Sequence, residues 1–133
     1  MKLNIDCVRD VMVLLESKIG FKSVRDAGGT EQIHWGQVRF DEILRAKYGE
    51  SDLIYSLQKL SEAHYIDVKA TLNGTLWIDC YINDITWQGH EFLNAFRSDA
   101  IWEVAKEEAA EIEISSIKAL WLIADKITKE RIS

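Results

Sequence analysis

Apolar and polar residues near the start of the chain follow the spacing of an amphipathic helix. The pattern predicts a helix from Ile5 to Ile19, which ends where Gly20 allows the chain to turn. Its apolar face consists of Val8, Val11, Met12, Leu15 and Ile19. A helix with one apolar face packs that face on a core. A short strand is predicted next, at residues 32–35.

Helical spacing returns at Phe40 and continues through two adjacent segments. The first is capped by Asp41 and breaks at residues 48–49, and the second runs from about Glu50 to Ala63. The residues predicted to face the core are Ile43, Leu44, Leu53, Leu57 and Leu60. Two helices joined by a tight turn make a helix-turn-helix. At the junction that follows, His64 is expected to accept a left-handed conformation, which histidine tolerates better than most residues.

Strict alternation over residues 66–82 is the clearest β signal of the chain. Asn73-Gly74 is the preferred central pair of a type I′ turn, so the segment is predicted to form an antiparallel hairpin. The face predicted to be buried carries Ile66, Val68, Ala70, Leu72, Leu76, Ile78, Cys80 and Ile82. Trp77, Asp79 and Tyr81 are predicted on the opposite face. Either the short strand or a later helix covers these two aromatic residues, or they form a partner surface.

A further helix is predicted to open at Thr86, whose hydroxyl can cap its first turn. Its apolar stripe consists of Phe92, Leu93, Phe96, Ala100 and Val104. The helix continues unbroken or restarts near Ser98, and a second stripe that includes Trp102 needs another partner. A last helix, capped by residues 115–116 and carrying Trp121, can cover this stripe within the monomer or across a dimer. We predict a homodimer whose interface includes Trp102 or Trp121 and residues of the last helix.

The order of these elements is that of a winged helix-turn-helix followed by extra helices. We predict a mainly helical α+β fold in which the hairpin is the wing. The length of 133 residues suits one domain with a core of its own. We therefore predict a single winged-helix-like domain over residues 1–133, with a core at 1–98 and a C-terminal helical extension at 99–133.

Three blocks of the chain form a pattern that is shared with a known family. They are Met1-Lys2-Leu3 with Asp6 and Val8-Arg9-Asp10; Ile54-Tyr55-Ser56-Leu57 with Leu60 and Glu62-Ala63-His64-Tyr65-Ile66; and Ile85-Thr86-Trp87-Gln88-Gly89-His90-Glu91-Phe92-Leu93-Asn94-Ala95-Phe96-Arg97-Ser98-Asp99 with Trp102. In these blocks the chain resembles the domain-of-unknown-function family 2513. It departs from the family in a longer segment around residues 20–36 and at His64, where members usually have glycine. The resemblance implies a bacterial or prophage protein with a winged-helix-like fold, and it implies no activity.

Charge is unevenly distributed along the chain. Residues 1–48 carry eight Lys or Arg against seven Asp or Glu, residues 49–84 two against six, and residues 85–133 six against nine, for a net charge of −6. The segment that holds the second helix of the helix-turn-helix and the wing is therefore the most acidic for its length. Because binding to duplex DNA depends on cations near phosphates, this acidity opposes a role in DNA binding.

The chain shows no pattern of a signal peptide or of a membrane span, so we expect a cytoplasmic protein that does not enter a membrane. Its two cysteines, Cys7 and Cys80, are too few and too distant in sequence for a disulfide scaffold or a metal knuckle. In the cytoplasm they are expected to be reduced, packed thiols.

No motif in the chain indicates an enzyme. His90-Glu91 begins like a zinc-protease helix, but that motif needs a second histidine at the position of Asn94. For His90 and Glu91 we expect hydrogen bonds to the hairpin or to the backbone at the start of a helix. Gly28-Gly29 lacks the lysine and hydroxyl residue of a phosphate-binding loop. We predict no catalytic residue, no metal site and no cofactor.

Two classes of function remain open. In the first, the chain is a regulatory protein that binds duplex DNA through the second helix of the helix-turn-helix. The residues expected to contact DNA are Arg45, Lys47, Ser51, Tyr55, Gln58, Lys59 and Lys69. In the second, the same fold is a protein-interaction module, such as a phage-encoded modulator of a host complex, whose acidic surface meets a basic partner. The residues expected at a partner or dimer surface are Trp77, Tyr81, Trp102 and Trp121.

Overall fold

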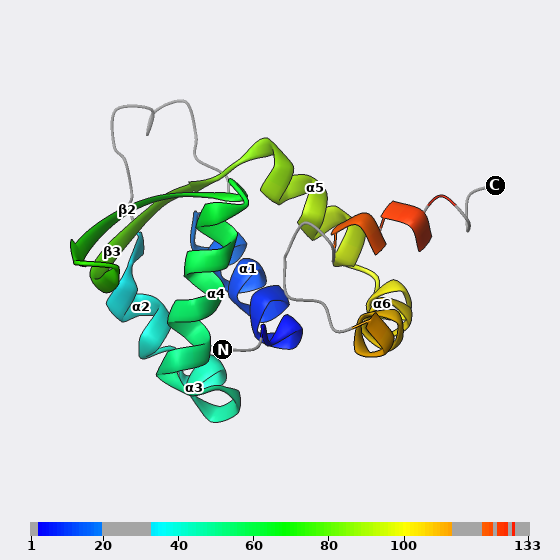
Figure 1. The fold of residues 1–133 in the computed structure, drawn as a ribbon, viewed down its shortest axis with the longest axis horizontal. Coiled ribbons are helices and arrows are strands. Elements are labelled where there is room, and N and C mark those ends of the chain that lie inside the picture. The colour runs from blue at the N-terminus through cyan, green and yellow to red at the C-terminus, as the bar shows by residue number, and fades with distance from the viewer. Residues whose placement is uncertain (1–2, 20–32, 113–120, 124, 128, 130–133) are drawn as a thin grey trace.

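The computed structural model of the chain describes residues 3–19, 33–112, 121–123, 125–127 and 129. Its elements in chain order are α1 (Ile5–Ile19), β1 (Ile33–His34), α2 (Trp35–Arg39), α3 (Glu42–Lys47), α4 (Glu50–Glu62), β2 (Ile66–Asn73), β3 (Leu76–Ile85), α5 (Trp87–Phe96) and α6 (Asp99–Ile112). Figure 1 shows α1 and α4 packed together, with the β2–β3 hairpin extending to one side and α5 and α6 to the other. The predicted α+β architecture is confirmed.

The first half of the chain follows the predicted order of elements. Helix α1 has the predicted bounds, and its residues Val8, Val11, Met12 and Leu15 are fully buried. The predicted strand is shorter than expected, because Trp35 already begins α2. Asp41 caps α3 by accepting a hydrogen bond from the Leu44 amide at 3.0 Å. The break before α4 falls at Tyr48 and Gly49, as predicted.

One core prediction in the helix-turn-helix is wrong. Leu44, Leu53, Leu57 and Leu60 are buried, but Ile43 is 70% exposed. Helix α3 has only six residues, so the face that carries Leu44 is covered while the adjacent residue points to solvent.

The three strands form an antiparallel sheet in the order β1-β3-β2. His64 links α4 to β2 with a φ of 61°, which is the left-handed conformation expected at this junction. This sheet order, together with the helices that precede the hairpin, is compatible with the predicted winged-helix-like fold.

The hairpin differs from its prediction at the turn. Asn73 pairs with Leu76, so the two central residues are Gly74 and Thr75 instead of Asn73 and Gly74. Among the described residues of this turn, only Gly74 has a positive φ, of 65°. A positive φ at the first central residue alone is the pattern of a type II′ turn, where glycine is favoured.

Two bulges interrupt β3, at Ile78 and Asn83, and the one at Ile78 changes which side chains face the core. Ala70 pairs with Cys80 and Leu72 pairs with Trp77, so Ile78 is an extra residue in β3. The bulge turns Trp77 to the core side, where it is half-buried, and this corrects its predicted position beside Asp79 and Tyr81. The predicted burial of the hairpin tip is also wrong, since the exposed fractions are 54% for Leu72, 62% for Leu76 and 56% for Ile78.

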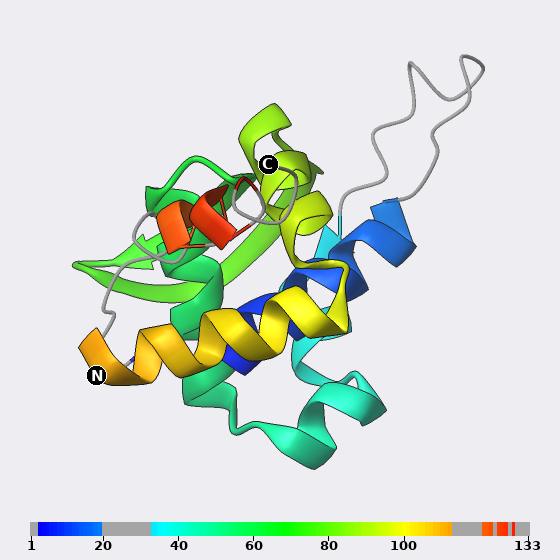
Figure 2. The ribbon, with the colours of Figure 1, turned by 90° about the vertical axis from the view of Figure 1, so that its right-hand side faces the viewer.

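The segment after the hairpin is two helices. Thr86 caps α5 as predicted, because its Oγ1 accepts a hydrogen bond from the Gly89 amide at 3.1 Å. Phe92, Leu93 and Phe96 are buried, but the chain restarts at Asp99 to form α6, so the expected continuation of the stripe through Ala100 is wrong. Figure 2 shows α6 running across α1.

A single cluster of buried side chains joins the winged-helix elements to the C-terminal part of the chain. It includes Trp102 and Ala105 of α6, and Ile123 and Ile127 beyond it. Ring contacts connect Tyr65, Phe92, Phe96 and Trp102 through centroid distances of 5.3, 4.7 and 4.9 Å. The structure therefore places residues from both predicted parts, 1–98 and 99–133, in one core.

The start of α2 depends on a histidine side chain. Nδ1 of His34 accepts a hydrogen bond from the Gly36 amide at 3.0 Å, while the Gln37 side chain accepts one from the His34 amide at 3.0 Å, which forms a capping box. Nε2 of His34 lies 2.7 Å from Asp79 Oδ1 on β3. This one side chain therefore links the helix start to the sheet.

We predict that His34→Ala lowers the free energy of unfolding by about 1–2 kcal/mol, because a lost cap typically costs this amount. His34→Asn retains a side-chain acceptor for the cap and should recover about half of the loss. Urea denaturation of the three proteins measures both effects. Equal stability of His34→Ala and the parent would show that water replaces the cap without cost.

Candidate functional site

Helix α4 holds the position of the recognition helix in this fold, and four predicted contact residues lie on its accessible side. Ser51 is exposed, and Tyr55, Gln58 and Lys59 are half-buried. Lys59 Nζ lies 5.3 Å from the centre of the Tyr55 ring and 3.0 Å from a carboxylate oxygen of Glu62. The hydrogen bond to Glu62 raises the pKa of Lys59 above its usual value. The ammonium of α4 is therefore already engaged by a carboxylate of the same helix.

The structure gathers two arginines at the N-terminal end of α4. The guanidinium groups of Arg39 and Arg45 lie 4.6 and 5.6 Å from the centre of the Phe40 ring, and Arg39 Nε is 3.1 Å from Glu50 Oε1. Arg39 is thus neutralised by the first residue of α4. Arg45 forms no ion pair with the described residues, so its positive charge is not neutralised by them.

Lys47 does not belong to that cluster. Its Nζ lies 3.4 Å from Asp10 Oδ2 on α1, and the same oxygen accepts a 2.7 Å hydrogen bond from the Tyr48 hydroxyl. Burial and this carboxylate raise the pKa of Tyr48 well above its usual value, so its hydroxyl remains a donor. Lys47 therefore stabilises the contact between α1 and α3.

Lys69 lies on the solvent side of the sheet. It pairs with Tyr81 across the hairpin, while the next pair, Ala70 and Cys80, lies on the core side. Tyr81 in turn contacts the His34 ring, with 4.9 Å between centroids. The short strand β1, one of the two elements predicted to cover Tyr81, thus contacts its ring. The cations expected to contact DNA therefore come from α3, α4 and β2, and Lys47 and Lys59 are paired with carboxylates.

The four residues expected at a partner surface also separate. Trp102 is 3% exposed, and its Nε1 donates a 3.1 Å hydrogen bond to Asp6 Oδ1 of α1. Trp77 is half-buried against the core, whereas Tyr81 is 41% exposed. Because Trp102 is buried inside the monomer, it does not provide the dimer surface that the sequence predicted.

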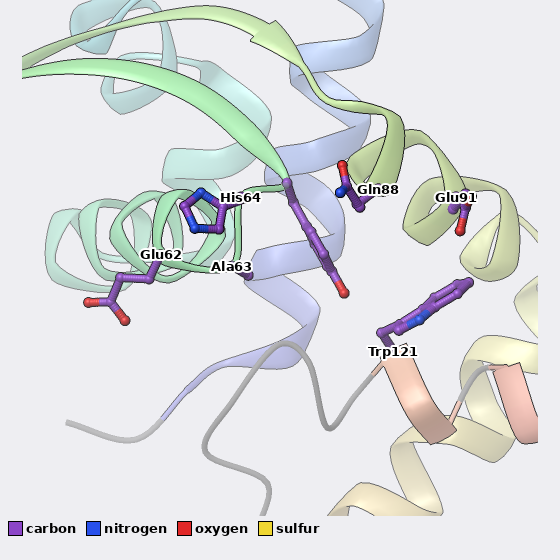
Figure 3. Close-up of a pocket in the computed structure, with 7 residues that line it drawn as sticks. Glu62, Ala63, His64, Gln88, Glu91 and Trp121 are labelled. Carbon is purple, nitrogen blue, oxygen red and sulfur yellow. The ribbon is translucent and has the colours of Figure 1, made fainter.

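Trp121 lines a cavity of about 430 Å³. The other lining residues come from the end of α4, the turn after it and the start of α5, and they are Glu62, Ala63, His64, Tyr65, Gln88 and Glu91. Figure 3 shows Glu91 next to Trp121 at one end of the cavity and Glu62 at the other end. Burial, together with the charge of Glu91, raises the pKa of Tyr65 to about 12. The cavity thus combines two acidic residues with aromatic walls.

His90 and Glu91 are exposed on the first turns of α5. The expectation that their side chains hydrogen-bond to the hairpin or backbone is wrong, since neither does so among the described residues. In that same part of the chain, no group of three or more His, Cys, Asp or Glu side chains is placed to hold a metal ion. Burial raises the pKa of Cys7 to about 11 and that of Cys80 to about 12, so both free thiols stay protonated at neutral pH.

Sequence reasoning missed two features of this surface. One is the exposed tip of the hairpin with its bulge at Ile78, for which the alternating pattern gives no local signal. The cavity brings together segments that are far apart in sequence. Only the acidity of residues 49–84 indicated that the surface would favour cations.

The helix-turn-helix, the β1-β3-β2 sheet and the hairpin define a winged-helix-like domain with an acidic recognition helix. Comparison with family models identifies the family: the model of the hypothetical proteins of DUF2513 matches residues 2–115, so the chain belongs to this family. No curated protein and no solved structure matches the chain. Over the described residues, no helix is both long enough and apolar enough to cross a membrane.

Proposed function

We propose that this winged-helix-like protein acts in regulation by binding a basic protein partner. The observation that supports the proposal is the charge of the two elements that a winged helix presents to a ligand. Helix α4 carries three carboxylates against one lysine, a net charge of −2. The β2–β3 hairpin likewise carries three aspartates against one lysine, a net charge of −2.

This charge disfavours phosphates and favours cations. Phosphate contacts supply much of the affinity of DNA-binding proteins, and they require Lys or Arg at the interface. Here Lys47 and Lys59 are paired with carboxylates, so among the described residues Lys69 is the one lysine of α4 and the hairpin without a carboxylate partner. A basic protein surface would instead meet complementary charge. If the chain functions within a prophage, such a partner would be a host or phage protein.

The cavity beside α4 offers an anchor for a cationic side chain of the partner. Glu91 forms no ion pair with the described residues, and it lines the cavity together with the indole of Trp121. A guanidinium group placed here would meet a carboxylate and an aromatic face, both of which bind arginine. We therefore expect an arginine of the partner to occupy this cavity.

We predict that the protein binds a fluorescein-labelled hexa-arginine peptide at low salt and that Glu91→Gln weakens the binding about tenfold, because a carboxylate contact to a guanidinium is lost. Trp121→Leu should weaken it by a smaller factor. Fluorescence anisotropy measures both, and Glu107→Gln is the matched control, since it removes the same charge from an exposed residue of α6.

Equal losses from Glu91→Gln and Glu107→Gln would mean that the peptide senses only the net charge of the protein, and the anchor would be wrong. Absence of peptide binding at micromolar protein and low salt would contradict the proposed function itself.

DNA binding is the second candidate, and the position of Arg45 favours it. Arg45 lies unneutralised near the N-terminal end of α4, whose exposed side also carries Gln58, a residue type that can read adenine. If this function holds, a labelled duplex binds more tightly than the peptide, affinity falls steeply with salt, and Arg45→Glu abolishes it. Lys69→Glu should also weaken the binding, because Lys69 is an exposed lysine of the hairpin that forms no ion pair with a described residue.

A further inference from the structure

Strand β2 is an exposed edge of the sheet. It runs without interruption over Ile66–Asn73 and pairs only with β3 among the described strands. Both extra residues of the hairpin, Ile78 and Asn83, are in β3, so no bulge interrupts β2. An edge strand presents unpaired N–H and C=O groups on its open side, and proteins usually protect such edges with bulges or short strands. The edge of β2 has neither, and its exposed charges, Asp67 and Lys69, oppose pairing with a strand whose charges do not match.

The solvent side of β2 carries two charges of opposite sign. Asp67 and Lys69 are exposed, and neither forms an ion pair with a described residue. Asp67 lies directly across the ladder from Asp84, which places two carboxylates in a like-charge pair. Like charges directly opposite each other destabilise a sheet. Asp67 therefore has no cationic partner within the described part of the monomer. It lies on β2, the edge strand of the sheet.

We propose that β2 pairs antiparallel with β2 of a second copy of this chain, with Val68 opposite Val68 at the two-fold axis. In this register Asp67 of each copy lies opposite Lys69 of the other copy, so the two-fold symmetry forms two equivalent charge pairs. Each lysine also approaches a site of carboxylate repulsion between Asp67 and Asp84. This inference concerns self-association and does not rest on the proposed binding of a basic partner.

Charge selects this register among its neighbours. A shift of one residue would place solvent-side residues opposite core-side residues. The nearest registers that keep the two faces in place would pair Asp67 with Asp67 or Lys69 with Lys69, and both are like-charge pairs. The register with Val68 at the axis is the one among these that joins opposite charges.

The same pairing explains two exposed apolar sites. In this register residues 66–70 of the two β2 strands pair, so Leu72 at the hairpin tip would extend past Ile66 of the second copy toward the turn at His64. His64 adjoins the start of α5, because its carbonyl accepts a 2.6 Å hydrogen bond from the Thr86 hydroxyl. Trp87, the next residue, is 77% exposed. Pairing thus brings the apolar tip of one copy to the exposed tryptophan of the other.

Sedimentation velocity at low salt over a micromolar concentration series tests the proposal with charge exchanges. Asp67→Lys and Lys69→Asp each convert both charge pairs to repulsive ones, so each should raise the dimer dissociation constant by at least about tenfold. The double variant Asp67→Lys with Lys69→Asp restores opposite charges across the axis and should return the constant to near that of the parent. Thermal unfolding of each variant confirms that the fold is retained.

A disulfide test does not depend on charge. Val68→Cys places two thiols at the axis, where Cβ atoms of an opposed pair are about 4.5–5.5 Å apart, so oxidation should give a covalent dimer. Thr71→Cys is the control, because its two copies lie about 20 Å apart in the proposed register. A parent that is monomeric throughout, a double variant that fails to dimerise, or equal cross-linking of both cysteine variants would overturn the proposal.

Discussion

Gly89→Ala is expected to unfold the protein or to lower its free energy of unfolding by about 3 kcal/mol or more. An added Cβ would overlap the backbone oxygen of Tyr65 and would lie 2.7 Å from Cγ2 of Ile85. That oxygen accepts a 3.0 Å hydrogen bond from the Thr86 amide, so it is fixed in place. Since backbone cannot move aside as a flexible side chain can, α5 would have to separate from the hairpin.

Urea denaturation measures the effect, and Gly49→Ser is the matched control. Gly49 caps α4 without a side-chain hydrogen bond, and a Cβ added there meets no atom within 4 Å. The serine should therefore leave stability unchanged or raise it by a few tenths of a kcal/mol through a new cap, because glycine is itself a favourable N-cap residue. A Gly89→Ala protein as stable as Gly49→Ser would show that α5 does not pack as closely as the structure describes.

Trp102→Ala is expected to lower the free energy of unfolding by about 3–5 kcal/mol, the usual cost of removing a large buried aromatic residue. Its ring contacts Phe96 edge to face at 4.9 Å, its Nε1 donates to Asp6, and the guanidinium of Arg9 lies 5.3 Å from its ring. The variant thus loses the contacts that join α6 to both α1 and α5. Thermal and urea unfolding of the full chain measure the loss.

Trp87→Ala is the control for this experiment, because Trp87 is 77% exposed and its removal should change the stability of the monomer by less than about 0.5 kcal/mol. Dilute protein is used so that self-association does not contribute. If Trp102→Ala left stability intact but abolished a dimer, the original prediction of a dimer contact at Trp102 would be right and its burial in the monomer wrong.

The residues around Gly89 that carry the family resemblance are required by the structure, and they indicate no catalytic activity. The Thr86 hydroxyl accepts a hydrogen bond from the Gly89 amide and donates one to the His64 carbonyl. Because Gly89 has no side chain, the Tyr65 carbonyl can pack against it. The block is therefore a structural joint between the hairpin and α5. Its residues were sufficient to predict the cap, but the reason for glycine lies in the carbonyl of Tyr65, more than twenty residues earlier in the chain.

The positions of the Trp77 side chain and of the basic side chains could not be predicted from the sequence. Alternation placed Trp77 beside Asp79 and Tyr81, but a bulge at Ile78 reversed its side. Likewise, Arg45, Lys47 and Lys69 were all predicted to contact DNA. In the structure Lys47 pairs with Asp10 of α1 and Lys69 lies on the solvent side of the sheet, because contacts between distant segments determine where each charge lies.

The features that depend on near neighbours in the chain could be predicted from the sequence. Helix periodicity, the caps at Asp41 and Thr86 and the left-handed residue at His64 each arise from interactions within a few residues, so a local pattern records them. The direction of the hairpin tip, the burial of Trp102 and the pairing of Lys47 with Asp10 could not be predicted in this way. These depend on packing and ion pairs between segments that folding alone brings together, which no local pattern encodes.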